Sequence, residues 1–390
     1  MNVACVGAGP AGLFLSILMK EREPAHEITV FERSQAGVTH GWGVVFWDDL
    51  LDEVRAADPE TASAIAKHAF RWSGERLLVG NEDPVLLEVP GYAIGRRRLL
   101  DLLLERARSV GVRVRFGAEV AHPAELRDAD LIAVCDGANS RLRHVLRGPL
   151  GTRFHTGSNK YVWLGTTKVF DDFTFAFVET AAGWIWCHAY GFDGETSTFI
   201  VECSTPTWSL LGFDRIGEAE TLARLERLFE PHLDGHPLRA NAGTRWQSFR
   251  TVTNENWQHA NVALLGDAAH TTHFTIGSGT KLALEDAIAL AEVQDGRPLR
   301  TALEDYERQR KAALHRWQTD ARFSARWFEN IPRYAELGPA RFFGLMHERR
   351  SPLLPSCPPR LYYGLHRATH DVAALRQLRR WAAPVIKALC

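Results

Sequence analysis

The sequence predicts an α/β fold in which a dinucleotide-binding domain with a parallel sheet is interleaved with an antiparallel-sheet domain and followed by C-terminal helices. Three observations support this fold class. An apolar strand leads into a glycine triplet, a helix and a second strand within the first forty residues. Aromatic and β-branched runs of strand length fill residues 151–250. Beyond Arg297 the pattern becomes helical and rich in arginine, tryptophan and phenylalanine.

The N-terminal motif has the residue order of a dinucleotide site. The apolar run Val3–Val6 is followed by Gly7-x-Gly9-x-x-Gly12 and a helix. Gly7 permits a tight turn, Gly9 lets the backbone approach a pyrophosphate, and Gly12 lets the helix pack on the strand. The helix N-terminus offers free N–H groups to the phosphates. A second strand ends in Glu32, about twenty residues after the triplet, where a carboxylate accepts hydrogen bonds from a ribose.

Two later stretches indicate which dinucleotide is bound. Residues 128–143, DADLIAVCDGANSRLR, form an apolar strand that ends in Asp-Gly. Residues 266–292, GDAAHTTHFTIGSGTKLALEDAIALAE, combine Gly-Asp, a glycine loop and a helix. Together with the N-terminal triplet, these motifs resemble the single-component FAD-dependent aromatic hydroxylases, the group typified by p-hydroxybenzoate hydroxylase. The resemblance implies a Rossmann-like FAD-binding domain of the glutathione reductase type, with FAD as the cofactor.

The same resemblance implies a set of FAD contacts. They are Gly7, Gly9 and Gly12 at the pyrophosphate, Glu32 at the adenosine ribose, Arg33 beside the adenine, Arg96 at the polar chain, Asp136 in FAD and pyridine-nucleotide handling, Asp267 at a ribityl hydroxyl, and Gly277 and Gly279 at the pyrimidine edge of the flavin. Asp136 at a strand end is also compatible with a plain helix cap. The flavin loop explains the spacing of Asp267, His270 and His273, so we expect no metal site. We expect His270 to stabilise the loop.

Three structural units are predicted from these patterns. They are an FAD-binding domain of residues 1–70, 92–150 and 251–300, a substrate-binding β-sheet domain of residues 71–91 and 151–250, and a C-terminal helical segment of residues 301–390. In the second unit, runs such as FTFAFVET and GWIWCHAYGF predict antiparallel strands. Residues 217–233 predict one amphipathic helix.

Composition and charge exclude several classes of protein. The chain has 46 Lys and Arg against 47 Asp and Glu, so its net charge of −1 favours no nucleic acid partner. No signal peptide precedes the first strand and no apolar run reaches the length of a membrane span, so a cytoplasmic protein is expected. The 6 cysteines show no C-x-x-C pair, which excludes a disulfide reductase. No second glycine triplet follows a strand, so NADH or NADPH is expected as a transient reductant.

Further stretches narrow the resemblance to one branch. Residues 40–50, 273–291 and 325–352 look like the flavin monooxygenases that act on aryl-CoA thioesters, namely salicylyl-CoA 5-hydroxylase and the monooxygenase half of 2-aminobenzoyl-CoA monooxygenase/reductase. This resemblance implies an aromatic substrate, in the form of a CoA thioester, that is hydroxylated with O₂ through a hydroperoxide at the flavin C4a. The alternative is an indole, a tryptophan-derived compound or a free aromatic acid as the substrate. A flavin reductase that does not use O₂ is a further alternative, and a monomer or homodimer is expected.

The catalytic candidates come from the loop and from an early segment. His273 and Phe274 stand where p-hydroxybenzoate hydroxylases have two prolines, and we expect them to face the C4a edge of the flavin. Thr275 and Ser278 are candidate donors there. His273 and His40 are candidates for a base, and a structural role is open for each of them.

A CoA thioester also carries phosphates that need a surface site. The C-terminal segment offers Arg341, Arg349 and Arg350, and arginine binds phosphate with two parallel hydrogen bonds. A solvated basic face is the alternative for these three residues.

Overall fold

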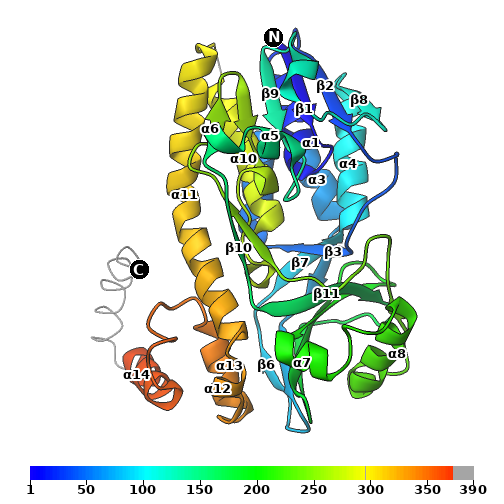
Figure 1. Ribbon diagram of the computed structural model, residues 1–390, viewed down its shortest axis with the longest axis vertical. Coiled ribbons are helices and arrows are strands. Elements are labelled where there is room, and N and C mark those ends of the chain that lie inside the picture. Colours follow the sequence, from blue (N-terminus) through cyan, green and yellow to red (C-terminus); the bar gives the residue numbers. More distant parts are fainter. Residues whose placement is uncertain (295, 372–390) are drawn as a thin grey trace.

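The computed structural model describes residues 1–294 and 296–371, and its first layer is a mostly parallel sheet (Figure 1). The 6 strands run in the order β17-β18-β9-β1-β2-β8. Their bounds are β1 (Asn2–Val6), β2 (Glu27–Glu32), β8 (Arg113–Phe116), β9 (Leu131–Val134), β17 (Gln258–His259) and β18 (Val262–Leu264). All neighbours pair in parallel except β17 and β18. The predicted α/β class with a parallel, Rossmann-like sheet is confirmed.

Helix α1 (Pro10–Arg22) is an interior helix because it packs against other helices as well as the sheet. Its residues 10–19 are all buried, and it contacts α4 (Arg96–Ser109) and α10 (Gly279–Val293). Gly12 permits this close packing, since a Cβ there would lie 2.1 Å from the carbonyl oxygen of Gly7. The shorter helices of this region are α2 (Asp48–Ala57), α3 (Pro59–His68), α5 (Arg141–Val145) and α6 (Arg147–Leu150).

A second, antiparallel layer lies at the other end of the molecule (Figure 1). Its 7 strands run in the order β15-β11-β14-β13-β12-β5-β6. Their bounds are β5 (Glu75–Val79), β6 (Val85–Leu87), β11 (Asn159–Thr166), β12 (Phe173–Thr180), β13 (Gly183–Gly191), β14 (Ser197–Ser204) and β15 (Leu238–Arg239). Only the β12–β5 pair is parallel. Two small sheets lie between the layers: β3 (Gly43–Phe46), β4 (Phe70–Trp72) and β7 (Gly91–Gly95), and the ribbon of β10 (Arg153–Thr156) and β16 (Arg250–Thr253).

The helix predicted over residues 217–233 is interrupted, so that prediction is wrong in its extent. The structure has α8 (Glu218–Leu228) and a separate turn α9 (Glu230–Leu233), besides the short α7 (Thr205–Leu210). Pro231 supplies no N–H to continue the hydrogen-bond ladder of the first helix. The chain therefore leaves the helical path at Phe229, whose φ is −107 and ψ is 16.

Helix α11 (Leu299–Phe328) spans 30 residues and joins the two layers, because it runs along the long axis of the molecule (Figure 1). Near its start, the Tyr306 hydroxyl donates to the carbonyl oxygen of Leu264 at 2.9 Å, beside the parallel sheet. Near its end, Trp327 and Phe328 belong to a core that includes Trp186 of the antiparallel sheet. The chain continues through α12 (Pro332–Ala335), α13 (Pro339–His347) and α14 (Pro359–Asp371).

A buried carboxylate holds β18, α10 and α11 together. Asp286 is fully buried and accepts hydrogen bonds from the backbone N–H of Gly266 at 2.8 Å, from Nε2 of His270 at 2.8 Å and from Nε of Arg310 at 2.7 Å. Burial acts to raise the pKa of this carboxyl, but His270 and Arg310 outweigh it and hold the pKa below the ordinary 3.8. Asp286 is therefore an anion that links the loop after β18 to both helices, and His270 has the loop-stabilising contact expected for it.

We predict that Asp286→Asn lowers the free energy of unfolding by about 3 kcal/mol, because it removes the buried anion between Arg310 and His270 and leaves Glu285 as the remaining acid partner of Arg310 among the described residues. Glu304→Gln on α11 is the control, since it removes only the exposed pair with Arg300 and should cost less than about 1 kcal/mol. Denaturant titrations of both variants measure the two changes. The lowered pKa means that this stabilisation is present above pH 3.8 and is lost as the pH falls through the folded-state value, so the two proteins should converge in acid. Equal losses in both variants would contradict the role of Asp286.

Candidate functional site

Two connected cavities lie beside the carboxyl ends of the parallel strands. The first has a volume of about 210 Å³ and the second of about 650 Å³. Gly9, Arg96, Cys135 and Gly137 line both of them, so the cavities meet at these residues. Ligands of open α/β sheets bind at this edge, and the position therefore identifies the pair of cavities as the candidate site.

The glycine loop between β1 and α1 forms one wall of the first cavity. Gly7 has a φ of 108, and a Cβ there would lie 2.4 Å from the carbonyl oxygen of Cys135, so only glycine fits. Gly9 precedes the first residue of α1 and has no side-chain cap for the helix N–H groups. A Cβ at Gly9 would meet no atom closer than 4.0 Å. The free N–H groups and the helix dipole make this wall suitable for a phosphate.

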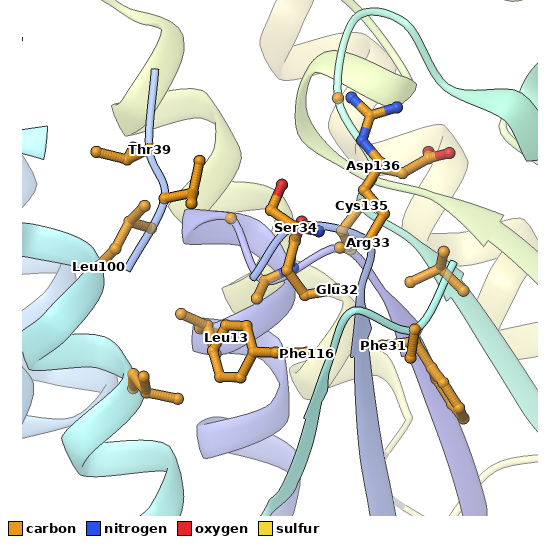
Figure 2. A pocket seen from close by; sticks show the side chains of 18 of the residues that line it. Leu13, Phe31, Glu32, Arg33, Ser34, Thr39, Leu100, Phe116, Cys135 and Asp136 are labelled. Atoms are coloured by element: carbon orange, nitrogen blue, oxygen red, sulfur yellow. Dashed lines mark hydrogen bonds between the residues drawn. The ribbon is translucent and has the colours of Figure 1, made fainter. Parts of the chain in front are cut away.

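Two of the carboxylates that line the first cavity are Glu32 and Asp136. Glu32 and Ser34 lie between Leu100 and Thr39 on one side and Asp136 on the other (Figure 2). The two oxygens of Glu32 each accept one backbone hydrogen bond, at 2.9 Å and 2.8 Å, and each oxygen retains a second lone pair.

Asp136 presents a free acceptor at the same place. Its Oδ2 accepts from the N–H of Arg141 at 2.9 Å, as in a helix cap. Its Oδ1 is buried and has no hydrogen-bond partner within the described part of the chain. Burial raises the pKa of this carboxyl. An unpaired buried acceptor at a cavity wall fits a ligand that supplies a donor. Arg33 also lines this cavity and is exposed.

Arg143 connects the two motifs that follow the glycine triplet. Ser140 caps the short helix α5 by accepting from the N–H of Arg143 at 3.0 Å. The guanidinium of Arg143 is buried and donates to the carbonyl oxygens of Ala138 at 2.6 Å, Asp267 at 3.2 Å and Ala268 at 3.0 Å. The sequence motif included Arg143 without assigning it a role, because carbonyl acceptors so far along the chain are visible only in the tertiary structure.

The Gly-Asp loop after β18 lines the larger cavity. The carboxyl of Asp267 faces the larger cavity, and the surrounding protein raises its pKa although Arg96 acts in the opposite direction. Burial likewise lowers the pKa of Arg96. Gly277 has a φ of 65, and a Cβ there would lie 2.8 Å from the side chain of Val45. Gly279 is the first residue of α10 and lines the same cavity, so the positive end of this helix faces the cavity.

The pair His273-Phe274 is divided between the cavity wall and the protein behind it. Phe274 lines the larger cavity, and its ring centroid lies 4.8 Å from that of Tyr161. The His273 ring, which is outside the set of lining residues, stacks on Phe274 at 4.5 Å and lies tilted against Phe249 at 4.7 Å. Burial lowers the pKa of His273 to about 4. Its imidazole is therefore neutral and a weak base near pH 7.

A chain of hydrogen bonds holds this pair from the C-terminal side. Nδ1 of His273 lies 3.0 Å from Oγ1 of Thr275, which lies 2.8 Å from Oγ of Ser324 on α11. Arg349 donates to the same serine at 3.1 Å and to the carbonyl oxygen of Thr275 at 3.2 Å. Burial and the neighbouring Arg350 lower the pKa of Arg349 to about 10. The prediction that Arg349 binds phosphate at the surface is therefore wrong, because its guanidinium is committed to the loop.

The structure does not bring His40 together with His273 and Phe274. His40 lines the first cavity, where its Nδ1 lies 2.7 Å from the carbonyl oxygen of Ala242. Of the two expected donors, Ser278 lines the larger cavity and contacts Oγ1 of Thr272 at 2.9 Å. His40 and Phe274 therefore line different cavities, although the sequence proposed both for the catalytic site.

A buried carboxylate behind Phe274 was not foreseen from the sequence. Glu202 on β14 accepts hydrogen bonds from Asn159 at 2.8 Å and from Nε1 of Trp186 at 3.1 Å, and it lies 3.4 Å from Nε2 of His188. The ring of His188 meets that of Phe274 edge to face at 5.6 Å. Burial acts to raise the pKa of Glu202, but His188 and its other partners hold it below the ordinary value. The signal in the sequence was a single acid inside the apolar run STFIVECST.

Metal-binding clusters and membrane-spanning helices are both absent from the described residues. Within residues 1–294 and 296–371, no group of three or more His, Cys, Asp and Glu residues has an arrangement that could hold a metal ion. Over the same residues, no helix combines the length and apolar composition needed to cross a membrane.

Comparison with known proteins identifies the family to which this chain belongs. The model of the family described as "FAD binding domain" matches residues 1–320. Salicyloyl-CoA 5-hydroxylase from Streptomyces sp is 43% identical over 344 residues, which cover 86% of this chain and 66% of that protein. The chain thus spans slightly less than two thirds of that relative. The 3-hydroxy-4-methyl-anthranilyl-[aryl-carrier protein] 5-monooxygenase of Streptosporangium sibiricum is 34% identical over 336 residues. The aligned residues cover 85% of this chain and 90% of that protein. Protodeoxyviolaceinate monooxygenase of Chromobacterium violaceum is 30% identical over 91% of this chain and 96% of its own.

Solved structures agree on the fold. The 2-methyl-3-hydroxypyridine-5-carboxylic acid oxygenase matches with a TM-score of 0.69 at 18% identity, over 87% of this chain and 96% of its own. PqsL, a probable FAD-dependent monooxygenase from Pseudomonas aeruginosa, matches with a TM-score of 0.62 at 17% identity. The match covers 86% of this chain and 99% of PqsL. Members of this family use FAD with NAD(P)H as the reductant. From the family match over most of the chain and the relatives above, this protein belongs to the FAD-binding aromatic hydroxylases and is an FAD-dependent flavoprotein monooxygenase.

Proposed function

We propose that this monooxygenase hydroxylates the ring of an aryl-CoA thioester, as a salicylyl-CoA 5-hydroxylase does, using O₂ and NADH or NADPH. The observation that carries the proposal is the cavity of about 650 Å³ beyond the Gly-Asp loop. Its aromatic lining is Tyr161, Trp163, Tyr190, Phe249 and Phe274. Such a wall suits a planar ring. Two relatives, at 43% and 34% identity, have names that specify an aryl group on CoA or on a carrier protein.

The residues present fit FAD across both cavities. The proposed contacts are those implied by the sequence: Gly7, Gly9, Gly12, Glu32, Arg33, Arg96, Asp136, Asp267, Gly277 and Gly279. The free N–H groups at Gly9, the unpaired Oδ1 of Asp136 and the shared position of Arg96 support this placement. Bound and reduced FAD would supply the activated oxygen, one atom of which is transferred to an electron-rich ring.

The protein's own part is to orient the ring and to exclude water. Phe274 covers the cavity, and its position is fixed by His273 on one side and by His188 on the other. Because His273 is neutral, it brings no charge or hydration to this wall. A dry wall slows the wasteful release of activated oxygen. Since a thioester withdraws electrons from the ring, a ring hydroxyl or amino group is needed to direct attack para to itself.

The domain division stays a proposal as well. The substrate-binding unit of residues 71–91 and 151–250 contains every strand of the 7-stranded antiparallel sheet. The proposed substrate cavity takes Tyr161, Trp163, Tyr190 and Ile200 from this sheet and its glycine loops from the unit proposed to bind FAD. The ring would therefore lie between the two units.

A second candidate function is hydroxylation of an indole, a tryptophan-derived compound or a free aromatic acid. The similarity to protodeoxyviolaceinate monooxygenase over 96% of that protein favours it. Mass spectrometry after incubation with NAD(P)H and O₂ distinguishes the two. We expect one added oxygen atom on salicylyl-CoA or 2-aminobenzoyl-CoA, and little or none on the free acids or on tryptophan. Oxygen added only to substrates without CoA would overturn the thioester proposal.

We predict that Asp267→Ala weakens FAD binding by about tenfold to a hundredfold, because a hydrogen bond to a charged group contributes roughly 1.5–3 kcal/mol. Fluorescence titration of the apoprotein with FAD measures the change. Asp83→Ala is the control, since Asp83 is exposed and lines neither cavity. Equal affinity in the Asp267 variant and the wild type would remove this loop from the FAD site.

We predict that Phe274→Ala uncouples the reaction, so that hydrogen peroxide is released and the product formed per NAD(P)H falls several-fold, because water enters through the opened wall. Phe274→Leu keeps an apolar side chain of similar reach and should retain most of the coupling. Product and peroxide are measured together with NAD(P)H consumption. An unchanged ratio in Phe274→Ala would show that Phe274 does not shield the site.

A further inference from the structure

The larger cavity carries an excess of positive charge that the chain as a whole does not have. Its wall contains the cations Arg96, Lys160, Arg245 and Arg250 and the single acid Asp267. The whole chain has a net charge of −1. Arg96 and Asp267 lie in the segments proposed to hold FAD, which leaves three cations in the wall without such an assignment.

The sheet register brings these three cations to one edge. Strands β10 and β16 pair antiparallel, with Thr156 opposite Arg250. Further along, Tyr161 and Gln247 exchange backbone hydrogen bonds of 2.8 Å and 2.9 Å. The segment 245–250 therefore runs beside residues 156–161, which include Lys160. Thr156, Arg245, Gln247 and Arg250 are all exposed, so this edge is the solvent-facing mouth of the cavity.

The cations at this mouth remain available for a ligand. Among the described residues, no acid forms an ion pair with Lys160, Arg245 or Arg250. The Lys160 ammonium lies 5.3 Å from the ring centroid of Trp208. Nη2 of Arg250 donates to the carbonyl oxygen of Ala138 at 3.0 Å and to Oδ1 of Asn139, and no described residue accepts from its Nε or Nη1. Two guanidinium groups and an ammonium with no anion beside them form a site for phosphate groups.

We propose that Lys160, Arg245 and Arg250 bind the phosphate groups of the nucleotide tail of the thioester substrate, and that they thereby select CoA thioesters over free acids. The inference rests on the proposed function and replaces the C-terminal arginines, of which Arg349 is committed to the loop. The aryl ring occupies the aromatic part of the cavity, the pantetheine arm passes through the mouth, and the pyrophosphate and 3′-phosphate lie outside against the cations. NAD(P)H also carries a pyrophosphate, so the experiment must separate the two sources.

The test is the double variant Lys160→Glu/Arg245→Glu, assayed with salicylyl-CoA. We expect KM for the thioester to rise about tenfold, with a smaller dependence on ionic strength than in the wild type, because two ion pairs become repulsions. Arg341→Glu is the matched control: Arg341 is exposed on α13 and lines neither cavity, so KM should stay unchanged. FAD content and the denaturation midpoint verify that the double variant is folded.

The KM values and a binding titration together show whether the cations bind the thioester substrate or the reductant. A rise confined to KM for NAD(P)H would assign the cations to the reductant and overturn the proposal, as would no change in either KM. Calorimetric titration with adenosine 3′,5′-bisphosphate tests the phosphate site without an aryl group. If the wild type binds it and the double variant does not, while no aryl thioester is hydroxylated, the phosphate site stands and the proposed reaction fails. Absence of both binding and turnover overturns both.

Discussion

Asp286 lies out of contact with solvent between the loop after β18, the helix α10 and the helix α11, and its oxygens accept from a backbone N–H, an imidazole and a guanidinium. A carboxylate in such a place is stable only when each partner is held in position. The geometry of the Gly-Asp loop therefore depends on a helix that begins more than thirty residues later. The remainder of the site is arranged around this fixed loop: Arg143 supports it from one side, and the cavity opens on the other.

Helix α11 gives the molecule its second constraint. One end packs in the core of the parallel sheet and the other in the aromatic core beneath the antiparallel sheet. A single continuous helix therefore contributes side chains to both hydrophobic cores. Ser324 near its end also anchors Thr275, and Arg349 closes the same network. The C-terminal segment thus helps to position the loop whose Phe274 lines the substrate cavity.

The charged groups that hold the walls of the site differ from the charged groups that face the cavities. Charged groups such as Asp286, Glu202 and Arg349 form hydrogen bonds within the protein and hold the walls. The ions that face the cavities, Arg96, Asp136 and Asp267, have exposed or unpaired atoms and are the ones proposed to meet FAD. His273 also holds the wall, but as an uncharged ring, since burial lowers its pKa to about 4.

The sequence by itself determined the fold class, because apolar strands, glycines at fixed spacing and acids at strand ends are local patterns, and the resemblance of three such motifs to a known family implied the family and the cofactor. It also predicted β12 at its observed bounds, because a run of aromatic and β-branched residues of strand length is a local property. Pro231 is local too, and its effect on the 217–233 helix was overlooked. Only the tertiary structure decided that Arg349 binds the loop, that His40 and Phe274 line different cavities, and that Glu202 lies behind the aromatic wall. These facts depend on contacts between residues far apart in the chain, which the spacing of residues does not encode.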